Sequence, residues 1–474
     1  MRFRFLFYII LLLSIVACRK ETFLKDKNVK LAFSADTVLF DTVFTTIGTT
    51  TLQFKAYNTY SKPLLTNIYV ANGKNSNFRI NVDGKSGYIF EQVEIAAKDS
   101  IYIFVEATID PTNNNSPLVV LDSIIFETND NQQDVKLAAW GQDVHLINGE
   151  IIKNDTIWNN DKPYLIYNSM LLDTLQTLTI NEGVQIYLHK NSSIYIKGTL
   201  KVAGTKDNPV VFQGDRLEAW YDDIPGQWGH IRLLPGSIDN EIDYAIIKNG
   251  IIGIQVDTFM TVPALKLSNT IIQNMNAVAL YTQGSTVLSW NCVFANCGQY
   301  CVALTIGGSY AFYHCTIANY WGFSNRTTPA LVVNNYYQDI TNTLQIRPLD
   351  VLFGNCIISG SAENEIVLDE FPGYSNYFTY KFDYALLKIK QSEFSLSDTS
   401  KFKSIILNNN PNFASTSEKL DFSLDTLSPA KDKGKFEYAN YDNNIYNINT
   451  LKDIKGDDRN LDNGPDLGAY ERIE

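Results

Sequence analysis

Apolar and polar residues alternate with a period of two between residues 31 and 145. The stretch TLQFKAY, which begins at Thr51, places Leu52 and Phe54 on one face, and residues 101–105 and 124–126 have the same character. Asn-Gly and Asp-Gly pairs mark turns between such stretches. Alternation with these turns is typical of short antiparallel strands, and about seven strands in a segment of this length predict a β-sandwich.

The pattern changes further along the chain, where a heptapeptide returns about every 23 residues. The five copies are DYAIIKN from Asp243, SNTIIQN from Ser268, WNCVFAN from Trp290, YHCTIAN from Tyr313 and GNCIISG from Gly354. A small residue, aliphatic residues and then Asn, repeated at this period, predict the rungs of a parallel β-helix. The last interval is longer and contains an insertion around residues 325–347. The fold class predicted for the whole chain is therefore all-β.

At two positions of this repeat, we expect the residues of successive rungs to stack on one another. The third position is occupied by Ala245, Thr270, Cys292, Cys315 and Cys356. The seventh position is occupied by Asn249, Asn274, Asn296 and Asn319. We expect the three cysteines to be buried structural thiols, and the asparagines to form a hydrogen-bonded ladder at a turn that tolerates positive φ.

Two further cysteines lie outside that register. Counting from each ladder Asn, Cys301 matches Ile254 and Ala279, which suggests another inward position, whereas Cys297 directly follows a ladder Asn. A disulfide between Cys297 and Cys301 remains open. A zinc site would need four converging ligands, so we expect no metal there.

The net charge of −12 and the sequence pI of about 4.9 argue against nucleic-acid binding, because no Lys/Arg cluster offers a basic face. The N-terminus carries Arg2 and Arg4, followed by a short apolar run that ends in Ile15-Val16-Ala17-Cys18. This end resembles the lipobox of bacterial lipoproteins. The resemblance implies a signal peptide over 1–17, lipidation of Cys18, a tether over 18–30 and an outer-membrane location, which could be surface-exposed.

Three further resemblances concern the domains. The stretch FDTVFTTIGTTTLQFKAYNTYSKPL resembles the start of Ig-like domains of the ASPM/SPD-2/Hydin type, within residues 31–145. Residues 178–216, with Gly183, Gly198 and Gly204, resemble right-handed parallel β-helix proteins of Bacteroidetes, and imply a pectin-lyase-like solenoid over 146–425. Residues 426–474, which include Arg459 and the run DLGAYE, resemble the choice-of-anchor Q domain and imply the last coil and cap.

Parallel β-helices often act on polysaccharides, and two regions could carry such chemistry. Asp239, Glu241 and Asp243 are two apart along a strand and could share a face, as weak candidates for a catalytic site. The equivalent positions in the next rung, Ala264, Lys266 and Ser268, add no second acid.

The second region is the loop EAWYDDIPGQWGHI, residues 218–231, in which aromatic rings stand beside carboxylates, as in sugar-binding surfaces. Its candidate ligand-binding residues are Trp220, Tyr221, Asp222, Asp223, Trp228 and His230. The alternative is a loop that packs its aromatic residues inward.

A calcium loop at Asp458, Asn460 and Asp462 has the spacing of the first three ligands but lacks the Gly and Glu that should follow. We therefore expect no cofactor, with calcium as the alternative. The sequence favours a lipid-anchored envelope protein that binds glycans or proteins without catalysis. The competing hypothesis is a lyase or glycosidase that acts on an acidic or plant-type polysaccharide.

Overall fold

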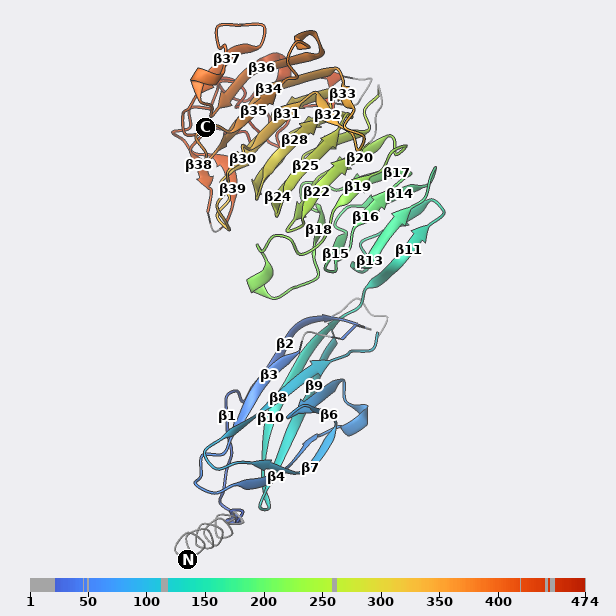
Figure 1. Ribbon diagram of the computed structural model, residues 1–474, viewed down its shortest axis with the longest axis vertical. Helices are drawn as coiled ribbons and strands as arrows, with labels where there is room; N and C mark the ends of the chain where they lie inside the picture. The colour runs from blue at the N-terminus through green and yellow to red at the C-terminus, as the bar shows by residue number, and fades with distance from the viewer. Residues whose placement is uncertain are drawn as a thin grey trace, which may run out of the picture. The chain divides into compact units, whose positions relative to one another are not determined.

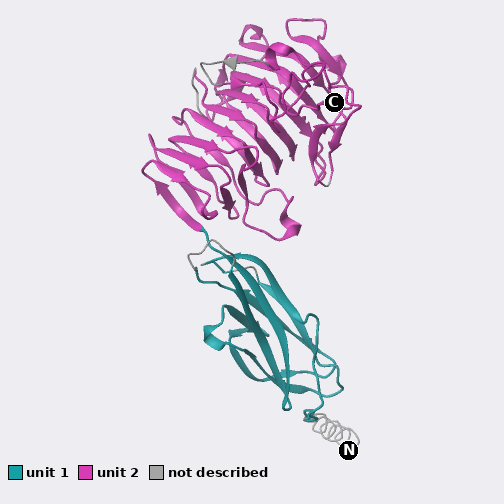
Figure 2. Cartoon of the chain, turned by 180° about the vertical axis from the view of Figure 1, so that it is seen from behind, with its two compact units in different colours: residues 1–144 teal, residues 145–474 magenta. Residues whose placement is uncertain are grey.

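The computed structural model describes residues 22–473 except 46, 49–50, 112–117, 258–261, 418, 440–441 and 444–447. The predicted lipidation site at Cys18 lies outside the described residues. The chain divides into two compact units, residues 1–144 and 145–474 (Figure 2). In the part of the chain that is described, no helix is long and apolar enough to cross a membrane. The predicted all-β fold class is confirmed.

The first unit is a β-sandwich of two five-stranded sheets (Figure 1). One sheet has the order β1 (Ala32–Phe33), β3 (Leu52–Tyr57), β8 (Ser100–Ala107), β5 (Phe78–Val82) and β6 (Lys85–Gly87). The other has the order β2 (Thr37–Phe44), β10 (Asn131–Gln142), β9 (Leu118–Thr128), β4 (Leu64–Val70) and β7 (Ile89–Ile95). The strands alternate buried and less buried residues, so the inward faces form one core. The described strands outnumber the seven expected, because short edge strands such as β1 and β6 carry too little alternation to be recognised.

The second unit is a parallel β-helix, in which 25 strands form one continuous hydrogen-bonded system (Figure 1). Each coil contributes a strand to three faces. The first face contains β12 (Thr156–Trp158), β14 (Thr177–Asn181), β17 (Thr199–Ala203), β20 (Asn240–Asp243), β23 (Leu265–Ser268), β26 (Thr286–Trp290), β29 (Gly308–Tyr313) and the first halves of β34 (Leu349–Gly360) and β36 (Phe378–Leu387).

The second face contains the first half of β13 (Tyr164–Leu172), β15 (Gln185–Leu188), β18 (Val210–Gly214), β21 (Ala245–Lys248), β24 (Ile271–Met275), β27 (Val293–Cys297), β30 (Thr316–Asn319) and the second halves of β34 and β36. The third face contains the second half of β13, β16 (Ile194–Ile196), β19 (Ile231–Leu233), β22 (Ile252–Val256), β25 (Val278–Gln283), β28 (Tyr300–Thr305), β31 (Leu331–Asn334) and β35 (Ile366–Asp369). Strand β11 (His145–Ile152) opens the helix and β37 (Phe402–Leu407) ends it.

The corner between the first and second faces is a single residue with positive φ. The residues at this corner in successive coils are Tyr244, Asn269, Asn291, His314, Asn355 and Tyr384, with φ between 46° and 57°. A left-handed residue turns the chain sharply in one step, and Asn tolerates this conformation best among non-glycine residues. Asn291 Nδ2 donates to Asn269 Oδ1 at 3.0 Å, so the asparagine-to-asparagine hydrogen bond lies at this corner.

The prediction of a hydrogen-bonded ladder at Asn249, Asn274, Asn296 and Asn319 is therefore wrong. The first three residues do have positive φ, as predicted. Their side chains bond elsewhere: Asn249 Nδ2 donates to the Asp222 carbonyl at 2.7 Å, and Asn296 Oδ1 accepts from the Tyr320 amide at 3.1 Å. The corner between the second and third faces is longer than one residue, and the side chains of Asn249 and Asn296 bond to backbone groups there rather than to the next asparagine.

The five cysteines of the described chain are free and fully buried. Cys292, Cys315 and Cys356 stack in adjacent coils, because the residues that follow them, Val293, Thr316 and Ile357, are paired in register. Cys301 is level with Ala279, as expected, but Ile254 pairs with Leu280 instead. The match of Cys301 to Ile254 is wrong by one residue, because the corner after Asn249 is one residue shorter than the corner in later coils.

We expected residues 426–474 to form the last coil and cap, but the described residues from 411 onward form no further coil. They contain the hairpin of β38 (Phe413–Ser415) and β39 (Asp421–Leu424), the short helix α2 (Phe436–Ala439) and the pair β40 (Asp442–Asn443) and β41 (Ile448–Asn449), all outside the 25-stranded system. This C-terminal segment lies along the flank of the helix. Its Phe422, Ile454 and Tyr470 cover Val293 and Ala318, which point outward from the second face. The outward residues of this face are apolar, so they require a cover that a further coil would not provide.

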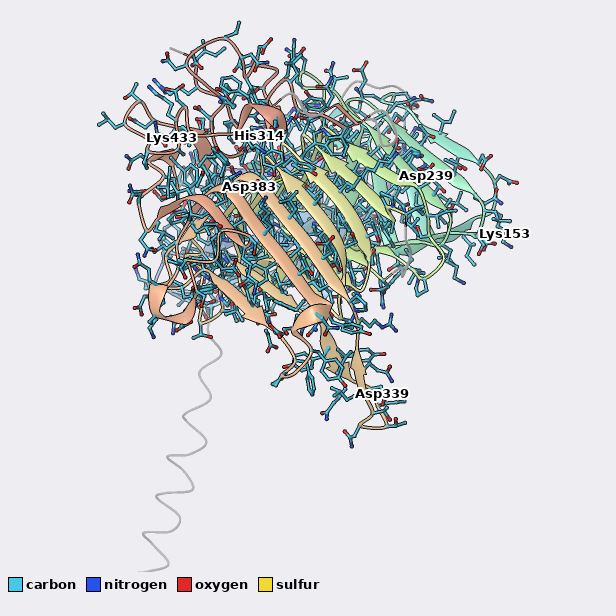
Figure 3. The ribbon with its side chains drawn as sticks, turned by 90° about the horizontal axis from the view of Figure 1, so that it is seen from above. Lys153, Asp239, His314, Asp339, Asp383 and Lys433 are labelled. Carbon is cyan, nitrogen blue, oxygen red and sulfur yellow. The ribbon has the colours of Figure 1, made fainter. Side chains whose placement is uncertain are left out.

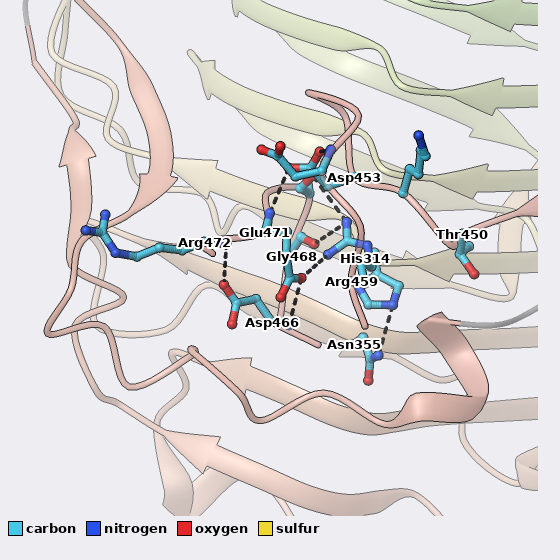
Figure 4. A network of polar contacts seen from close by, with 12 residues as sticks. His314, Asn355, Thr450, Asp453, Arg459, Asp466, Gly468, Glu471 and Arg472 are labelled. Carbon is cyan, nitrogen blue, oxygen red and sulfur yellow. Dashed lines mark hydrogen bonds and ion pairs between the residues drawn. The ribbon is translucent and has the colours of Figure 1, made fainter. Parts of the chain in front are cut away.

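Buried charges fix the C-terminal segment to the helix (Figure 4). Arg459 is fully buried: its Nη1 lies 3.0 Å from Glu471 Oε2, and its Nη2 donates to Asn291 Oδ1 at 3.0 Å. Burial raises the pKa of Glu471 to about 8, against the attraction of Arg459, and raises that of Asp466 to about 6. Burial and the charge of Arg459 act on the pKa of Glu471 in opposite directions, and the effect of burial is the larger.

Candidate functional site

The three acids proposed as catalytic candidates do not form a catalytic pair. Glu241 lies between two lysines of adjacent coils, with Lys266 Nζ at 2.7 Å and Lys201 Nζ at 3.5 Å. Lys201 Nζ also reaches Asp239 Oδ2 at 2.9 Å. Asp243 Oδ1 accepts hydrogen bonds from Ser268 Oγ at 2.7 Å and from Asn269 Nδ2 at 2.8 Å.

These contacts form a charge-balanced ladder on the outside of the first face, in the register predicted for Lys266 and Ser268. Burial raises the pKa of Asp243, but its hydrogen bonds from Ser268 and Asn269 oppose the shift. Figure 3 shows Asp239 at the edge of this face, well apart from His314. The ladder is best explained as the pairing of strand neighbours.

The loop between β18 and β19 separates its two tryptophans. Trp228 is fully buried in the helix core, and its Nε1 donates to the Lys248 carbonyl at 2.9 Å. Its assignment to a ligand-binding surface is wrong, because a residue with no exposed area cannot contact a ligand. Trp220 lies in a short 3₁₀ turn, Ala219–Tyr221, and 79% of it is exposed.

Hydrogen bonds and ring contacts hold the exposed part of this loop in place. Gln227 Nε2 donates to the carbonyls of Tyr221 at 2.6 Å and Ile224 at 2.8 Å. The Arg216 guanidinium lies 4.0 Å from the centre of the Tyr221 ring and pairs with Glu218 at 2.8 Å. Together with the bond from Asn249 to the Asp222 carbonyl, these contacts order the backbone on both sides of Trp220.

The carboxylates beside Trp220 are available to solvent. Asp222 and Asp223 are both exposed. The Asp223 carboxylate accepts a long hydrogen bond of 3.4 Å from Asn274 Nδ2. We call the surface formed by Trp220, Tyr221, Asp222 and Asp223 the tryptophan loop. It combines an aromatic face with free hydrogen-bond acceptors.

His230 belongs to a different environment from Trp220. Its ring is half-buried and meets the edge of Tyr195 at 5.5 Å, and its backbone amide donates to Ser193 Oγ at 3.2 Å. Burial lowers the pKa of His230, and the nearby charge of Arg232 adds to this effect. The histidine is therefore neutral at ordinary pH and packs against the third face.

Three residues at the base of the tryptophan loop were not predicted as site residues from the sequence. Tyr167, His189 and Asp215 directly follow Ile166, Leu188 and Gly214, which are paired from coil to coil. His189 Nδ1 lies 2.7 Å from Asp215 Oδ2, and the His189 ring stacks on Tyr167 with centroids 4.0 Å apart. The sequence does contain a signal for this column. Each member directly follows an inward residue of the second face, and the members are spaced by about one coil.

The possible calcium loop is a turn in this structure. The Asn460 amide donates to Asp458 Oδ1 at 3.0 Å, as in an Asx turn. Both carboxylate oxygens of Asp462 are buried without a hydrogen-bond partner. Among the described residues, no group of three or more His, Cys, Asp or Glu side chains is arranged to hold a metal ion.

No protein-family model and no curated protein matches the sequence. A family 123 glycoside hydrolase from Clostridium perfringens, solved in a study of glycolipid glycan hydrolysis, is 10% identical over 27% of this chain, with a TM-score of 0.19. This chain spans 30% of the length of that hydrolase.

A second solved structure is the catalytic domain of a GH87 α-1,3-glucanase, an aspartate variant in complex with nigerose. It is 10% identical and covers 76% of this chain and 88% of its own, with a TM-score of 0.20. At this identity and TM-score, neither structure indicates what this chain does.

Proposed function

We propose that the second unit is a carbohydrate-binding β-helix and that the tryptophan loop is its contact surface. The observation that carries the proposal is an exposed tryptophan on an ordered loop. Trp220 is 79% exposed, and its ring offers a large apolar face with a polar N–H group to a ligand. Because Gln227, Arg216 and Asn249 already fix the loop, little conformational entropy is lost when a ligand binds.

The chemistry of the loop suits a sugar. The apolar face of a sugar ring can stack on Trp220, and the Asp222 and Asp223 carboxylates can accept hydrogen bonds from its hydroxyl groups. These exposed acids disfavour a polyanionic ligand, so we propose a neutral glycan. We also propose that lipidated Cys18 tethers the protein to the outer membrane, where such a glycan would be accessible; an envelope protein is the alternative partner.

The first prediction concerns Trp220. Trp220→Ala in the full chain, purified in detergent, should weaken binding to a neutral glycan from a glycan array by at least about tenfold, equivalent to about 1.4 kcal/mol, because the stacking face is removed. Trp220→Phe should retain part of the affinity. Calorimetry against the best array ligand measures the difference.

A matched control is Leu175→Ala, which shortens a side chain that is 87% exposed and lies outside the loop. It should leave the affinity unchanged. Equal affinities of wild type and Trp220→Ala for every glycan that binds would refute the assignment of the tryptophan loop.

A further inference from the structure

The column at the base of the tryptophan loop has the geometry of an oriented base. The Asp215 carboxylate is 11% exposed and holds His189 Nδ1 at 2.7 Å, while the histidine side chain is 43% exposed. Stacking on Tyr167, with ring planes 9° apart, fixes the plane of the imidazole. Nε2 makes no hydrogen bond with any residue that the structure describes. A carboxylate that orients one nitrogen leaves the other free to take a proton.

The residues around His189 exclude several reactions that use such a base. A glycosidase needs two carboxyl groups across the scissile bond, whereas the column itself contains only Asp215, which is bonded to His189. A covalent mechanism needs a Ser or Cys on Nε2, and the described residues offer none there. Elimination from a uronate needs free cations for the substrate carboxylate, whereas Asp222 and Asp223 make this corner acidic.

We propose that His189 is the general base of a site that hydrolyses an O-acyl ester of a carbohydrate, with Asp215 and Tyr167 as positioning residues. The carbohydrate part of this substrate rests on the proposed function, since the tryptophan loop would hold the sugar. His189 Nε2 takes a proton from water, and the water oxygen bonds to the acyl carbon. The bond from that carbon to the sugar oxygen then breaks.

The imidazolium returns its proton to the departing sugar oxygen, so the products are a carboxylic acid and a free hydroxyl group. No oxidant or further reactant is consumed.

The test measures acetate release from acetylated xylan and 4-nitrophenol release from 4-nitrophenyl acetate by the full chain in detergent. His189→Ala should lower kcat/KM by at least about 100-fold on both esters, in the range that general-base catalysis contributes. Asp215→Asn should also lower kcat while leaving KM unchanged, because Asn no longer holds the imidazole in the orientation that a base requires. Tyr167→Phe keeps the stacking ring and should retain most activity.

The chain offers a matched control for unspecific catalysis by surface imidazole. His145 Nε2 lies 2.9 Å from Asp161 and the His145 ring stacks on Tyr164 at 4.7 Å, so it resembles His189 without adjoining the tryptophan loop in sequence. His145→Ala should leave both rates unchanged. Equal losses in the two histidine variants, or no ester cleavage above buffer by wild type, would overturn the proposal.

The two proposals fail separately. If 4-nitrophenyl acetate hydrolysis depends on His189 but no glycan binds, the proposed carbohydrate function is wrong and the base assignment stands. If glycans bind through Trp220 but His189→Ala does not alter either rate, the base assignment is wrong. Circular dichroism and glycan binding of His189→Ala show that the variant is folded.

Discussion

At the scale of single residues, the buried thiols show how a reactive side chain becomes structural. Cys292 Sγ donates to the Trp290 carbonyl at 3.2 Å, and Cys356 Sγ donates to the Gly354 carbonyl at 3.3 Å. Ala385 takes the same place one coil after Cys356, as Thr270 does one coil before Cys292. The position selects a small side chain that fits between rungs, and thiol chemistry is not needed there.

This gives a prediction for the described cysteines. A thiol reagent such as DTNB should modify none of the five in the native protein and all five in guanidinium chloride, because each is fully buried. Cys315→Ala should lower the free energy of unfolding by only about 1 kcal/mol, since a small cavity replaces one sulfur. Fast labelling of the native protein at any of these five positions would contradict a structural role.

At the scale of elements, the two kinds of corner differ in what they support. The one-residue corner joins the first and second faces and also receives the C-terminal segment. There Asn291 bonds to Asn269, to the Lys452 carbonyl and to Arg459. The corner between the second and third faces uses the same residue type at Asn274, whose side chain, among the residues that the structure describes, makes only the 3.4 Å contact with Asp223.

Two substitutions compare these corners. Asn274→Ala should lower the free energy of unfolding by about 1 kcal/mol, which is the cost of a left-handed alanine. Asn291→Ala should cost about 3 kcal/mol, because it also leaves the buried guanidinium of Arg459 short of an acceptor. Urea unfolding of the two variants measures the difference. Equal costs would show that Asn291 supports only its own turn.

At the scale of the whole second unit, the C-terminal segment closes the flank of the helix through groups that titrate. Arg459 is the buried cation, and Asp453, Asp466 and Glu471 surround it. Burial is the main cause that raises the pKa of each of these three acids. The attachment of the segment is therefore coupled to proton binding.

The sign of the pH effect follows from the raised pKa of Glu471. An acid whose pKa is higher in the folded chain binds its proton more tightly there. Its contribution to stability is complete below the usual value of 4.5 and is lost as pH rises through about 8. The unfolding temperature should fall between these pH values, and Glu471→Gln should flatten this fall because its amide cannot ionise. An unchanged pH dependence in Glu471→Gln would exclude Glu471 as its source.

The insertion in the repeat illustrates a limit of sequence reading at this scale. Residues 325–347 interrupt the period and include the hairpin of β32 (Tyr336–Gln338) and β33 (Leu344–Ile346), which projects from the helix with Asp339 at its tip (Figure 3). The broken period located the insertion. Its projection depends on contacts outside the period, such as the bond from Tyr336 OH to Asp369.

Local periodicity is enough to predict the β-sandwich, the parallel β-helix and the inward position of the cysteines. Periodicity reports which side of a strand faces the core, and it repeats in every coil. It also located the loop of Trp220, although it could not separate Trp220 from Trp228.

Which side chains meet depends on how the coils stack in three dimensions. Three sets of contacts join residues from different coils or from opposite ends of the unit. They are the ion pairs of Glu241 with two lysines, the His189–Asp215 pair and the Arg459 network. Such contacts depend on exact corner lengths: one residue fewer after Asn249 displaced the expected partner of Cys301. The C-terminal segment covers the flank of the helix instead of extending the helix, because the outward residues of the second face are apolar and need a cover.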